Sequence, residues 1–334
     1  MAGKLIENLE LKMRNKISNF SLKQFINDRG ILIAFILIVI ILTFATPNFM
    51  TAANIINVLR QVSCIGIATI GVGVLIIMGQ IDLAIGSTFA LAGIIAGLMV
   101  STGVGGFGLH PVLGYFAGIA TAVAVSLFSG AVVAKARIPA FIVTMGMMSI
   151  VRGLALIFAH GMPVGNFPEG FTYLGTKSIG PIPWTIVIFL ITIAVMWYIM
   201  EKRPLGRYIY AVGSNEDAAR AAGINVDRVK IKTYLIEGIL VGVAATVLAA
   251  RLKSAAPAMG AGYELDAIAG AIIGGVSFNG GIGSVPDMVL GALLIGVINN
   301  GMDLLGVEAF YKQVVKGSII IIAVLIDRKR TGRA

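Results

Sequence analysis

The sequence predicts an all-α protein that spans a membrane about ten times. Apolar residues make up 57% of its 334 positions, charged residues only 13%, and the mean hydropathy is +0.94. A soluble protein carries about 25% charged residues. The 42 glycines fit the same class, because small residues let membrane helices approach closely. A chain of this length has no core that could hide so much apolar surface, so much of it must face lipid.

Ten apolar segments follow one another along the chain. Crossing a bilayer of about 30 Å takes about 20 helical residues. The segments are 31–46, 65–79, 85–100, 111–135, 139–159, 182–200, 234–250, 265–276, 286–305 and 314–326. The segment 265–276 is too short to cross alone, so we expect a broken or re-entrant element, which is tolerated only inside a helix bundle. The sequence therefore predicts roughly eight to ten spans.

The basic residues fix the predicted orientation. Most of the 26 Lys and Arg residues fall in four groups: the first thirty residues, Lys135 with Arg137, the loop 201–233, and the last residues of the chain. Basic residues collect on the cytoplasmic side of membrane proteins. We therefore expect both termini in the cytoplasm, with a cytoplasmic amphipathic segment at 1–30, a transmembrane domain at 31–326 and a basic tail at 327–334.

Several function classes are disfavoured by composition. The net charge of +10 comes from residues at span ends, so it does not indicate nucleic-acid binding. The single cysteine, Cys64, allows no internal disulfide. His110 and His160 are too isolated to suggest a metal site. The chain has no Gly-x-x-x-x-Gly-Lys-[Ser/Thr] stretch, so we expect it to bind no ATP, no other cofactor and no metal, and not to be an enzyme by itself.

A polar, alanine-rich stretch at 214–226 interrupts the apolar sequence. Ser214 and Asn215 are good helix N-caps, and Glu216 and Asp217 suit the first turn of a helix. Gly223 is a typical helix end. The stretch therefore predicts a helix of roughly two turns in the cytoplasmic loop 201–233, presented to a partner protein.

Two short motifs resemble each other. Ile-Asp-Leu at 81–83 precedes the glycine- and alanine-rich stretch 92–97, and Glu-Leu-Asp at 264–266 precedes 269–275. In the predicted topology the first acidic turn faces inward and the second outward. An inverted repeat of five plus five segments would give this arrangement, although glycine-rich spans also resemble each other by chance.

These features come together in one family resemblance. The stretches that carry it are 80–87, 205–213, 214–226, 262–269, 274–281 and 299–307. With them the chain resembles, from about residue 46 to its end, the permease subunit of bacterial ABC importers for monosaccharides, the ribose and galactose class. The resemblance implies a second copy of the permease, separate ATPase subunits that bind ATP and Mg, and an extracytoplasmic sugar-binding protein.

The resemblance also assigns a role to the polar stretch. The coupling loop of many ABC importers reads Glu-Ala-Ala, three residues, Gly, and here Asp217, Ala218 and Ala219 are followed by Gly223 at that spacing. Asp stands where the family has Glu. The resemblance implies an ATPase-coupling helix, for which we name Ser214, Asn215, Glu216, Asp217, Ala218, Ala219, Arg220 and Gly223. A solvated helix between spans is the alternative.

Polar residues inside the predicted spans are candidates for a translocation path or gate, because ionisable groups are costly there. The candidates are Asp82, Arg152, Asp266, Asn299, Asn300 and Asp303. Arg152 is expected at a depth similar to Asp266 and Asp303, so it could instead form an ion pair with one of them. Asp82 could cap the following helix rather than form a gate. Asn299 and Asn300 could hold either the sugar or neighbouring helices.

Two basic residues, Arg251 and Lys253, fall on the outer side against the charge rule. They are candidates for docking the binding protein, and contact with lipid headgroups is the alternative.

An ion-coupled secondary transporter of a small polar solute remains a second function. It would need buried carboxylates coupled to the substrate, and Asp82, Asp266 and Asp303 all fall near span ends.

Overall fold

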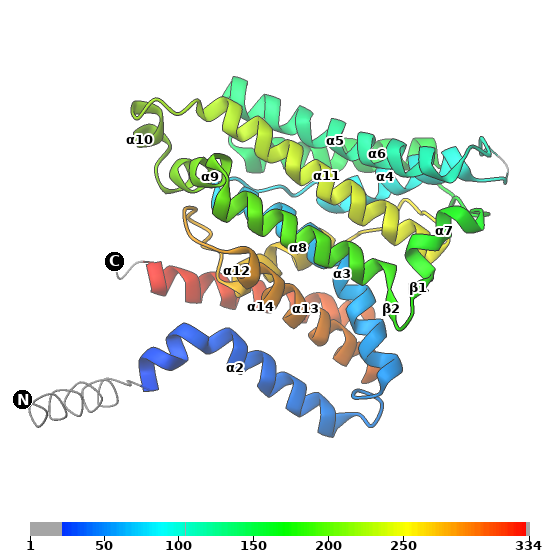
Figure 1. Ribbon diagram of the computed structural model, residues 1–334, viewed down its shortest axis with the longest axis horizontal. Coiled ribbons are helices and arrows are strands. Elements are labelled where there is room, and N and C mark those ends of the chain that lie inside the picture. The colour runs from blue at the N-terminus through cyan, green and yellow to red at the C-terminus, as the bar shows by residue number, and fades with distance from the viewer. Residues whose placement is uncertain (1–21, 104, 332–334) are drawn as a thin grey trace, which may run out of the picture.

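The computed structural model describes residues 22–103 and 105–331, and these residues form a bundle of helices (Figure 1). The helices are α2 (Leu22–Ala45), α3 (Ala52–Ile77), α4 (Ile85–Val100), α5 (Pro111–Ala136), α6 (Ala140–Phe158), α7 (Glu169–Thr176), α8 (Trp184–Lys202), α9 (Pro204–Ser214), α10 (Glu216–Ala221), α11 (Val226–Leu252), α12 (Tyr263–Gly274), α13 (Val285–Leu304) and α14 (Ala309–Thr331). One small antiparallel hairpin, β1 (Ser178–Ile179) with β2 (Ile182–Pro183), precedes α8.

The all-α membrane class is confirmed. Within the described residues, six helices are long and apolar enough to cross a membrane, and α4 and part of α2 are shorter apolar helices. Each of the predicted segments coincides with a helix. The start of the second segment was wrong: α3 begins at Ala52 rather than near residue 65, because the polar stretch with Asn54 and Asn57 continues the same helix. The exact number of spans stays a prediction.

The ends of the chain differ in part from the predicted division. The helix α2 begins at Leu22, inside the stretch 1–30 that was set apart from the first span. Residues 1–21 and 332–334 lie outside the described residues, and with them most of the amphipathic segment and the end of the basic tail. The start of α2, the end of α14 and the helix α10 lie at the same end of the molecule (Figure 1).

The two long helices α3 and α11 form the centre of the bundle, and they pack against each other. α11 also packs against α4 and α5, while α3 packs against α12 and α13. α4 lies against α5 and α6, and α12 lies against α13 and α14. The packing of α4 against α5, α6 and α11 therefore parallels the packing of α12 against α13, α14 and α3.

The helices α4 and α12 meet at their N-terminal ends. The backbone of Gly86 in α4 approaches the backbone of Gly260, just before α12, so closely that a Cβ on Gly86 would lie 2.5 Å from the Gly260 carbonyl oxygen. Only glycine leaves room for this approach. Phe89 and Tyr263 stack edge to face beside it, with ring centroids 5.3 Å apart. With 16 and 12 residues, α4 and α12 are about 24 and 18 Å long, so neither spans a bilayer of about 30 Å alone.

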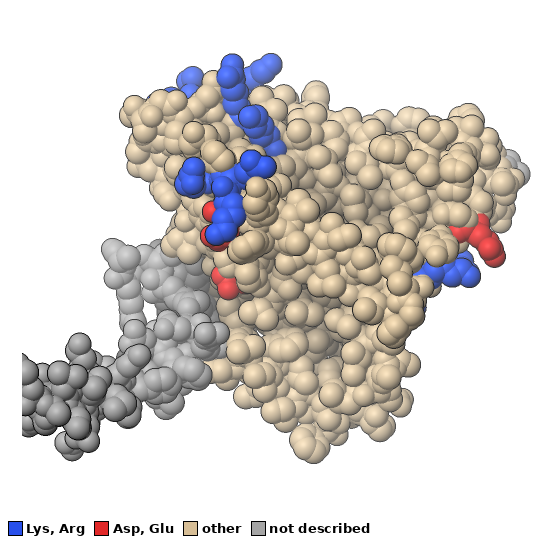
Figure 2. All heavy atoms as spheres, in the orientation of Figure 1, with Lys and Arg blue, Asp and Glu red and all other residues tan. Residues whose placement is uncertain are grey.

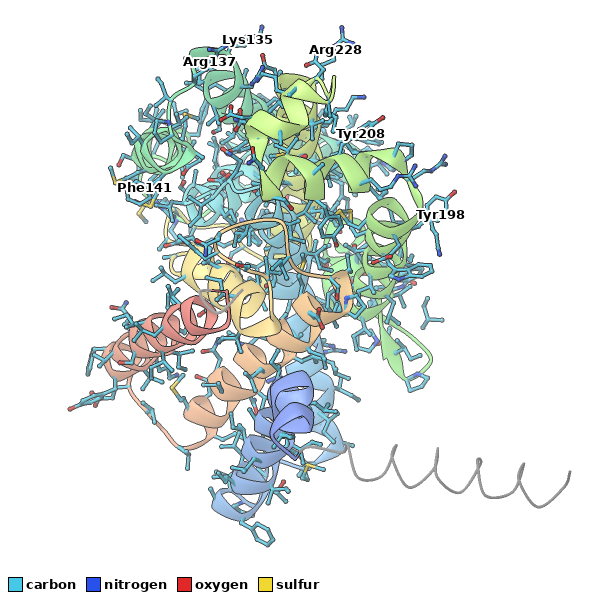
Figure 3. The ribbon with its side chains drawn as sticks, turned by 90° about the vertical axis from the view of Figure 1, so that its left-hand side faces the viewer. Lys135, Arg137, Phe141, Tyr198, Tyr208 and Arg228 are labelled. Carbon is cyan, nitrogen blue, oxygen red and sulfur yellow. The ribbon has the colours of Figure 1, made fainter. Side chains whose placement is uncertain are left out.

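Charged side chains are concentrated at the ends of the bundle. On the face drawn in Figure 2, Lys and Arg gather at the end that holds α9 and α10, and the broad middle of this face has no charged side chains. Seen from the α10 end, Lys135 in the last turn of α5, Arg137 just after it and Arg228 in α11 point outward from the rim (Figure 3). This distribution suits a molecule whose middle lies in lipid.

Candidate functional site

The first candidate functional element is the short helix α10, which links α9 to α11. It has six residues, slightly less than the predicted two turns. Its N-cap is Asn215, whose side-chain oxygen accepts a hydrogen bond from the Ala218 N–H at 2.9 Å. Ser214, expected to share the cap, is instead the last residue of α9, where its hydroxyl donates to the Tyr210 carbonyl at 2.9 Å.

Gly223 ends this helix as expected. Its φ is +83°, in the left-handed region that favours glycine. The Gly223 N–H donates to the Arg220 carbonyl at 3.0 Å, and the Ile224 N–H donates to the Ala219 carbonyl at 3.1 Å. This pair of bonds is a Schellman motif, which fixes the direction in which the chain leaves the helix. Asn225 then caps α11 by accepting from the Arg228 N–H at 3.0 Å.

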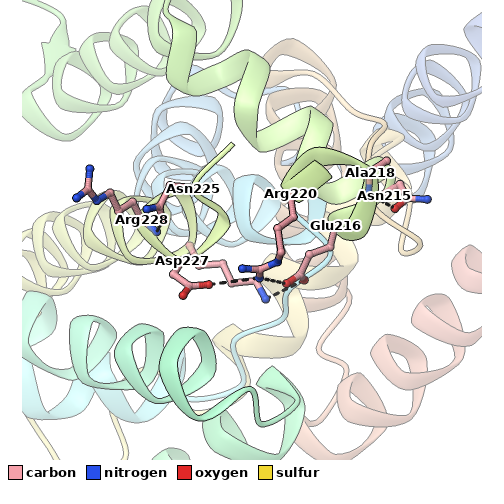
Figure 4. Close-up of polar contacts among 8 residues, drawn as sticks. Asn215, Glu216, Ala218, Arg220, Asn225, Asp227 and Arg228 are labelled. Atoms are coloured by element: carbon pink, nitrogen blue, oxygen red, sulfur yellow. Dashed lines mark hydrogen bonds and ion pairs between the residues drawn. The ribbon is translucent and has the colours of Figure 1, made fainter. Parts of the chain in front are cut away.

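A chain of ion pairs fastens α10 to α11 (Figure 4). One carboxylate oxygen of Glu216 lies 2.8 Å from the Lys230 ammonium, and the other lies 3.3 Å from the Arg220 guanidinium. Arg220 also reaches Asp227 at 3.4 Å. Lys230 is buried, with 10% of its side chain exposed, whereas Glu216, Arg220 and Asp227 are partly exposed. Short links at both ends of α10 and these ion pairs make α10 and the start of α11 one rigid unit.

The outward surface of α10 is made of small residues and one carboxylate. Ala218 and Ala221 are exposed, as is Asp217, while Ala219 is buried against the rest of the protein. A hollow of about 400 Å³ lies beside the C-terminal end of α10. Tyr208 from α9 and Arg228 from α11 line it, and both are visible at the edge of the α10 end (Figure 3).

The helix α9 is tied to the main bundle by Tyr210. Its hydroxyl donates to the Gly283 carbonyl at 2.7 Å, just before α13. Burial raises the pKa of this tyrosine, and the nearby carboxylates of Glu201 and Asp287 raise it further. The hydroxyl therefore stays protonated and keeps donating this bond.

A larger cavity of about 670 Å³ opens beside α10 and reaches into the bundle. Its wall includes both members of the ion pair Glu216–Lys230 and three residues of the turn between α3 and α4, namely Gly79, Gln80 and Ile81. The turn between α5 and α6 forms another part of the wall. A movement of α10 would therefore change the shape of this cavity.

A second polar group lies between α12, α13 and α14. Asp266 is 3% exposed and lies 2.7 Å from the Lys316 ammonium, and the Asn299 amide donates to it at 3.3 Å. Asp303 forms an ion pair with Lys312. All five side chains line one cavity of about 140 Å³. The structure thus brings together three of the candidate path residues, Asp266, Asn299 and Asp303.

The other candidate path residues lie elsewhere. An ion pair of Arg152 with Asp266 or Asp303 was wrong, because both aspartates are paired with lysines of α14. Arg152 instead donates to the backbone carbonyls of Pro257 and Met259, in the loop that leads to α12. Asn300 faces away from Asn299 and forms a reciprocal amide pair with Asn54 of α3, with both bonds at 2.9 Å.

Asp82 lies in the turn between α3 and α4 and is 1% exposed. Its carboxylate accepts from the Ala84 N–H at 2.6 Å. Ala84, not Asp82, is the N-cap of α4, so the expected cap was wrong and Asp82 closes an Asx turn just before the helix. Glu237 of α11, also 1% exposed, interacts with Asp82. Glu237 was not among the predicted path residues, although a carboxyl group inside the predicted span 234–250 was a signal for it.

Arg251 and Lys253 lie at the opposite end of α11 from α10. The 27 residues of α11 give a length of about 40 Å. Arg251 donates to the Asn57 side chain at 3.3 Å, and Lys253 is exposed. Within the part of the chain that the structure describes, no group of three or more His, Cys, Asp or Glu side chains is placed to hold a metal ion.

Comparison with known proteins gives one consistent family. The sequence model described as "branched-chain amino acid transport system / permease component" matches residues 54–324. The chain is 38% identical to the ribose import permease protein of Haemophilus influenzae, over 94% of this chain and 97% of that protein. It is 35% identical to the D-allose transport system permease protein of Escherichia coli, over 88% and 90%. It is 33% identical to the L-arabinose ABC transporter permease protein of Azospirillum brasilense, over 92% and 89%.

Proposed function

This chain belongs to the family of branched-chain amino acid transport system / permease components, and we propose that it forms the membrane path of an ATP-driven importer for a monosaccharide. Its relatives are transport components and not enzymes in their own right. The chain is a multi-pass protein of the bacterial inner membrane. In the importer it works with a second copy of itself, an ATPase subunit that supplies ATP and Mg, and an extracytoplasmic sugar-binding protein.

The observation that carries this proposal is the construction of α10. A cap at Asn215, a Schellman motif at Gly223 and the ion pairs of Glu216 make it rigid. Its exposed alanines let another protein approach closely. A rigid helix of this kind transmits a movement of the ATPase, whereas a flexible loop would absorb it. The Glu216–Lys230 pair passes that movement to the wall of the inner cavity.

The substrate that we propose is ribose or a closely similar sugar. The three relatives are named for ribose, D-allose and L-arabinose, and the identity is higher for the ribose permease. All three names denote small polyhydroxylated sugars. The family description mentions branched-chain amino acids, but the relatives above, which align over nearly the whole chain, are named for sugars.

The path that we propose alternates between the two membrane faces. The matching helix neighbours of α4 and α12 support an inverted repeat, in which each half supplies one gate. The cavity lined by Asp266, Asn299 and Asp303 offers amide and carboxylate groups that suit sugar hydroxyls. The cavity beside α10 is the inner vestibule. The ion-coupled alternative is not favoured, because one of the relatives is named as an ABC transporter permease.

The test is reconstitution in lipid vesicles. We expect uptake of labelled ribose when the chain is combined with its ATPase, the binding protein and ATP, and no accumulation when any of these is left out. Co-purification of an ATPase subunit with the tagged chain is the second expected result. Accumulation of sugar by the chain alone would contradict the proposal.

A further inference from the structure

A pair of carboxyl groups lies buried inside the bundle at the junction of three elements. Asp82 belongs to the turn between α3 and α4, Glu237 belongs to α11, and each is 1% exposed. Glu237 packs against Gly71 of α3 and lies beside the Ser126 hydroxyl of α5. Neither Asp82 nor Glu237 has a role in the transport mechanism proposed above.

Several hydrogen-bonding atoms in and around the pair have no hydrogen-bond partner among the described residues. Neither carboxyl oxygen of Glu237 has a hydrogen-bond partner among the described residues. The hydroxyl of Tyr234, also fully buried, has none either, yet it interacts with both carboxyl groups. Two ionised carboxylates could only accept, so the pair would lack a donor between its members. A proton on one of the two carboxyl groups supplies that donor. Two negative charges buried close together, away from water, repel each other, and this repulsion favours binding of the proton.

The surroundings decide which member holds the proton. Asp82 accepts from the Ala84 N–H and lies at the N-terminal end of α4, where the helix dipole stabilises negative charge. Among the described residues, Glu237 has no backbone N–H and no helix terminus beside it, and the Ser126 hydroxyl lies near its carboxyl group. We propose that Glu237 is protonated, that it donates a hydrogen bond to ionised Asp82, and that this shared proton fastens α11 to the turn between α3 and α4.

No other charge competes for the pair within the described helices that pack against α11. α4 has no titratable residue, and those of α3, α5, α7, α9 and α10 are Arg60, Cys64, Tyr115, Lys135, Glu169, Tyr173, Arg207, Tyr208, Tyr210, Glu216, Asp217 and Arg220. None of these side chains forms a hydrogen bond or an ion pair with Asp82 or Glu237 within the described part of the chain. Lys230, in α11 itself, is about 10 Å away along the helix and is paired with Glu216.

The position of the pair gives the proton a role in transport. Lys230 and Glu237 are seven residues apart, so they lie on the same face of α11. Lys230 joins that face to α10, and Glu237 joins it to the turn whose residues Gly79, Gln80 and Ile81 line the inner cavity. Glu237 is thus a positioning residue. When α11 moves with α10, the protonated pair carries the turn with it, and loss of the proton at high pH releases the turn.

The first experiment tests the proton on the purified chain, and so does not depend on the proposed importer. Infrared spectra recorded at increasing pH should show the C=O stretch of a buried, protonated carboxyl group, and this band should disappear as the pH rises. Glu237→Gln should lack this band, because its amide keeps the hydrogen bond to Asp82 without titrating. Glu169→Gln, at an exposed carboxylate of α7, should keep it. Asp82→Asn should lose the band at a lower pH, since the new amide can donate to an ionised Glu237.

The second experiment measures sugar uptake by the reconstituted importer and rests on the proposed function. Wild-type uptake should fall by up to about tenfold per pH unit on the alkaline side, and Glu237→Gln should remove this fall. Glu237→Leu, which cannot bond to Asp82, should lower uptake at every pH. The inference is overturned if the wild-type spectrum lacks the band, or if the band persists in Glu237→Gln. Absence of uptake in every variant, with the band present, speaks against the proposed function alone.

Discussion

Glu216 of α10 and Lys230 of α11 form an ion pair of 2.8 Å that also belongs to the wall of the inner cavity. Lys230 is 10% exposed at its side chain and Glu216 is 39% exposed, so the pair is buried from one side only. This contact connects the surface that we assign to the ATPase with the space that we assign to the substrate. Its removal should therefore affect transport more than folding.

Lys230→Met should uncouple ATP hydrolysis from uptake. The pair contributes only about 1 kcal/mol, because Glu216 keeps contact with solvent, so the protein should still insert and fold. We expect uptake to fall severalfold while ATP hydrolysis by the complex continues. The matched control is Lys232→Met, at an exposed lysine of the same helix, which should transport normally. Equal uptake by the two variants would count against the role of the pair.

Gly223→Val should also uncouple the two activities, for a different reason. The φ of +83° at this position is costly for a β-branched residue, and the Schellman motif that ends α10 would be lost. Membrane insertion should be unchanged, since no atom lies near enough to clash with a Cβ there. Gly223→Asn is the control, because Asn tolerates the left-handed region, and it should keep most of the uptake. Normal transport by the valine variant would show that the end of α10 is not important.

Lys316→Met should destabilise the protein. It leaves Asp266, which is 3% exposed, without a cationic partner. Removal of one member of a buried pair costs about 3 to 5 kcal/mol, and we expect the lower part of this range because Lys316 is 23% exposed. The measurement is thermal unfolding in detergent. Asp266→Asn combined with Lys316→Met should recover much of the lost stability, and a double variant less stable than Lys316→Met would contradict this explanation.

Arg251→Gln with Lys253→Gln should weaken docking of the sugar-binding protein. The two residues lie at the far end of α11, about 40 Å from α10, where we propose that the binding protein docks. The loss of affinity should be severalfold at low salt and smaller at physiological salt, because exposed charges are screened. Arg228→Gln, at the α10 end, is the control and should bind normally. An unchanged affinity of the double variant at low salt would exclude this docking site.

Local signals in the sequence predicted the ends of the helix α10 well. Asn215 and Gly223 have the roles that their residue types suggest, because caps depend on backbone geometry within a few residues. Ser214 was placed wrongly, since two good N-caps in a row do not tell which one ends the preceding helix. The short segment at 265–276 was predicted to be unable to cross alone, and α12 has that length.

Long-range contacts were the part that the sequence could not supply. Arg152 and Asp266 were expected at similar depths, yet depth does not say which helices are neighbours. Asp266 pairs with Lys316, fifty positions along the chain, and Arg152 binds backbone carbonyls, which have no sequence signature. Glu237 was overlooked among the polar residues near the start of its span, and its partner Asp82 became evident only once α11 and the turn before α4 were side by side.

The end-to-end meeting of α4 and α12 has a mechanical consequence. Two helices that meet at their ends do not transmit bending as one continuous helix does. At Gly86 and Gly260 two separate helices meet, so among the described residues α4 and α12 do not form one continuous helix, and a tilt of one is not forced on the other. In the importer that we propose, this break lets the two membrane faces open one at a time, without a continuous hole through the membrane.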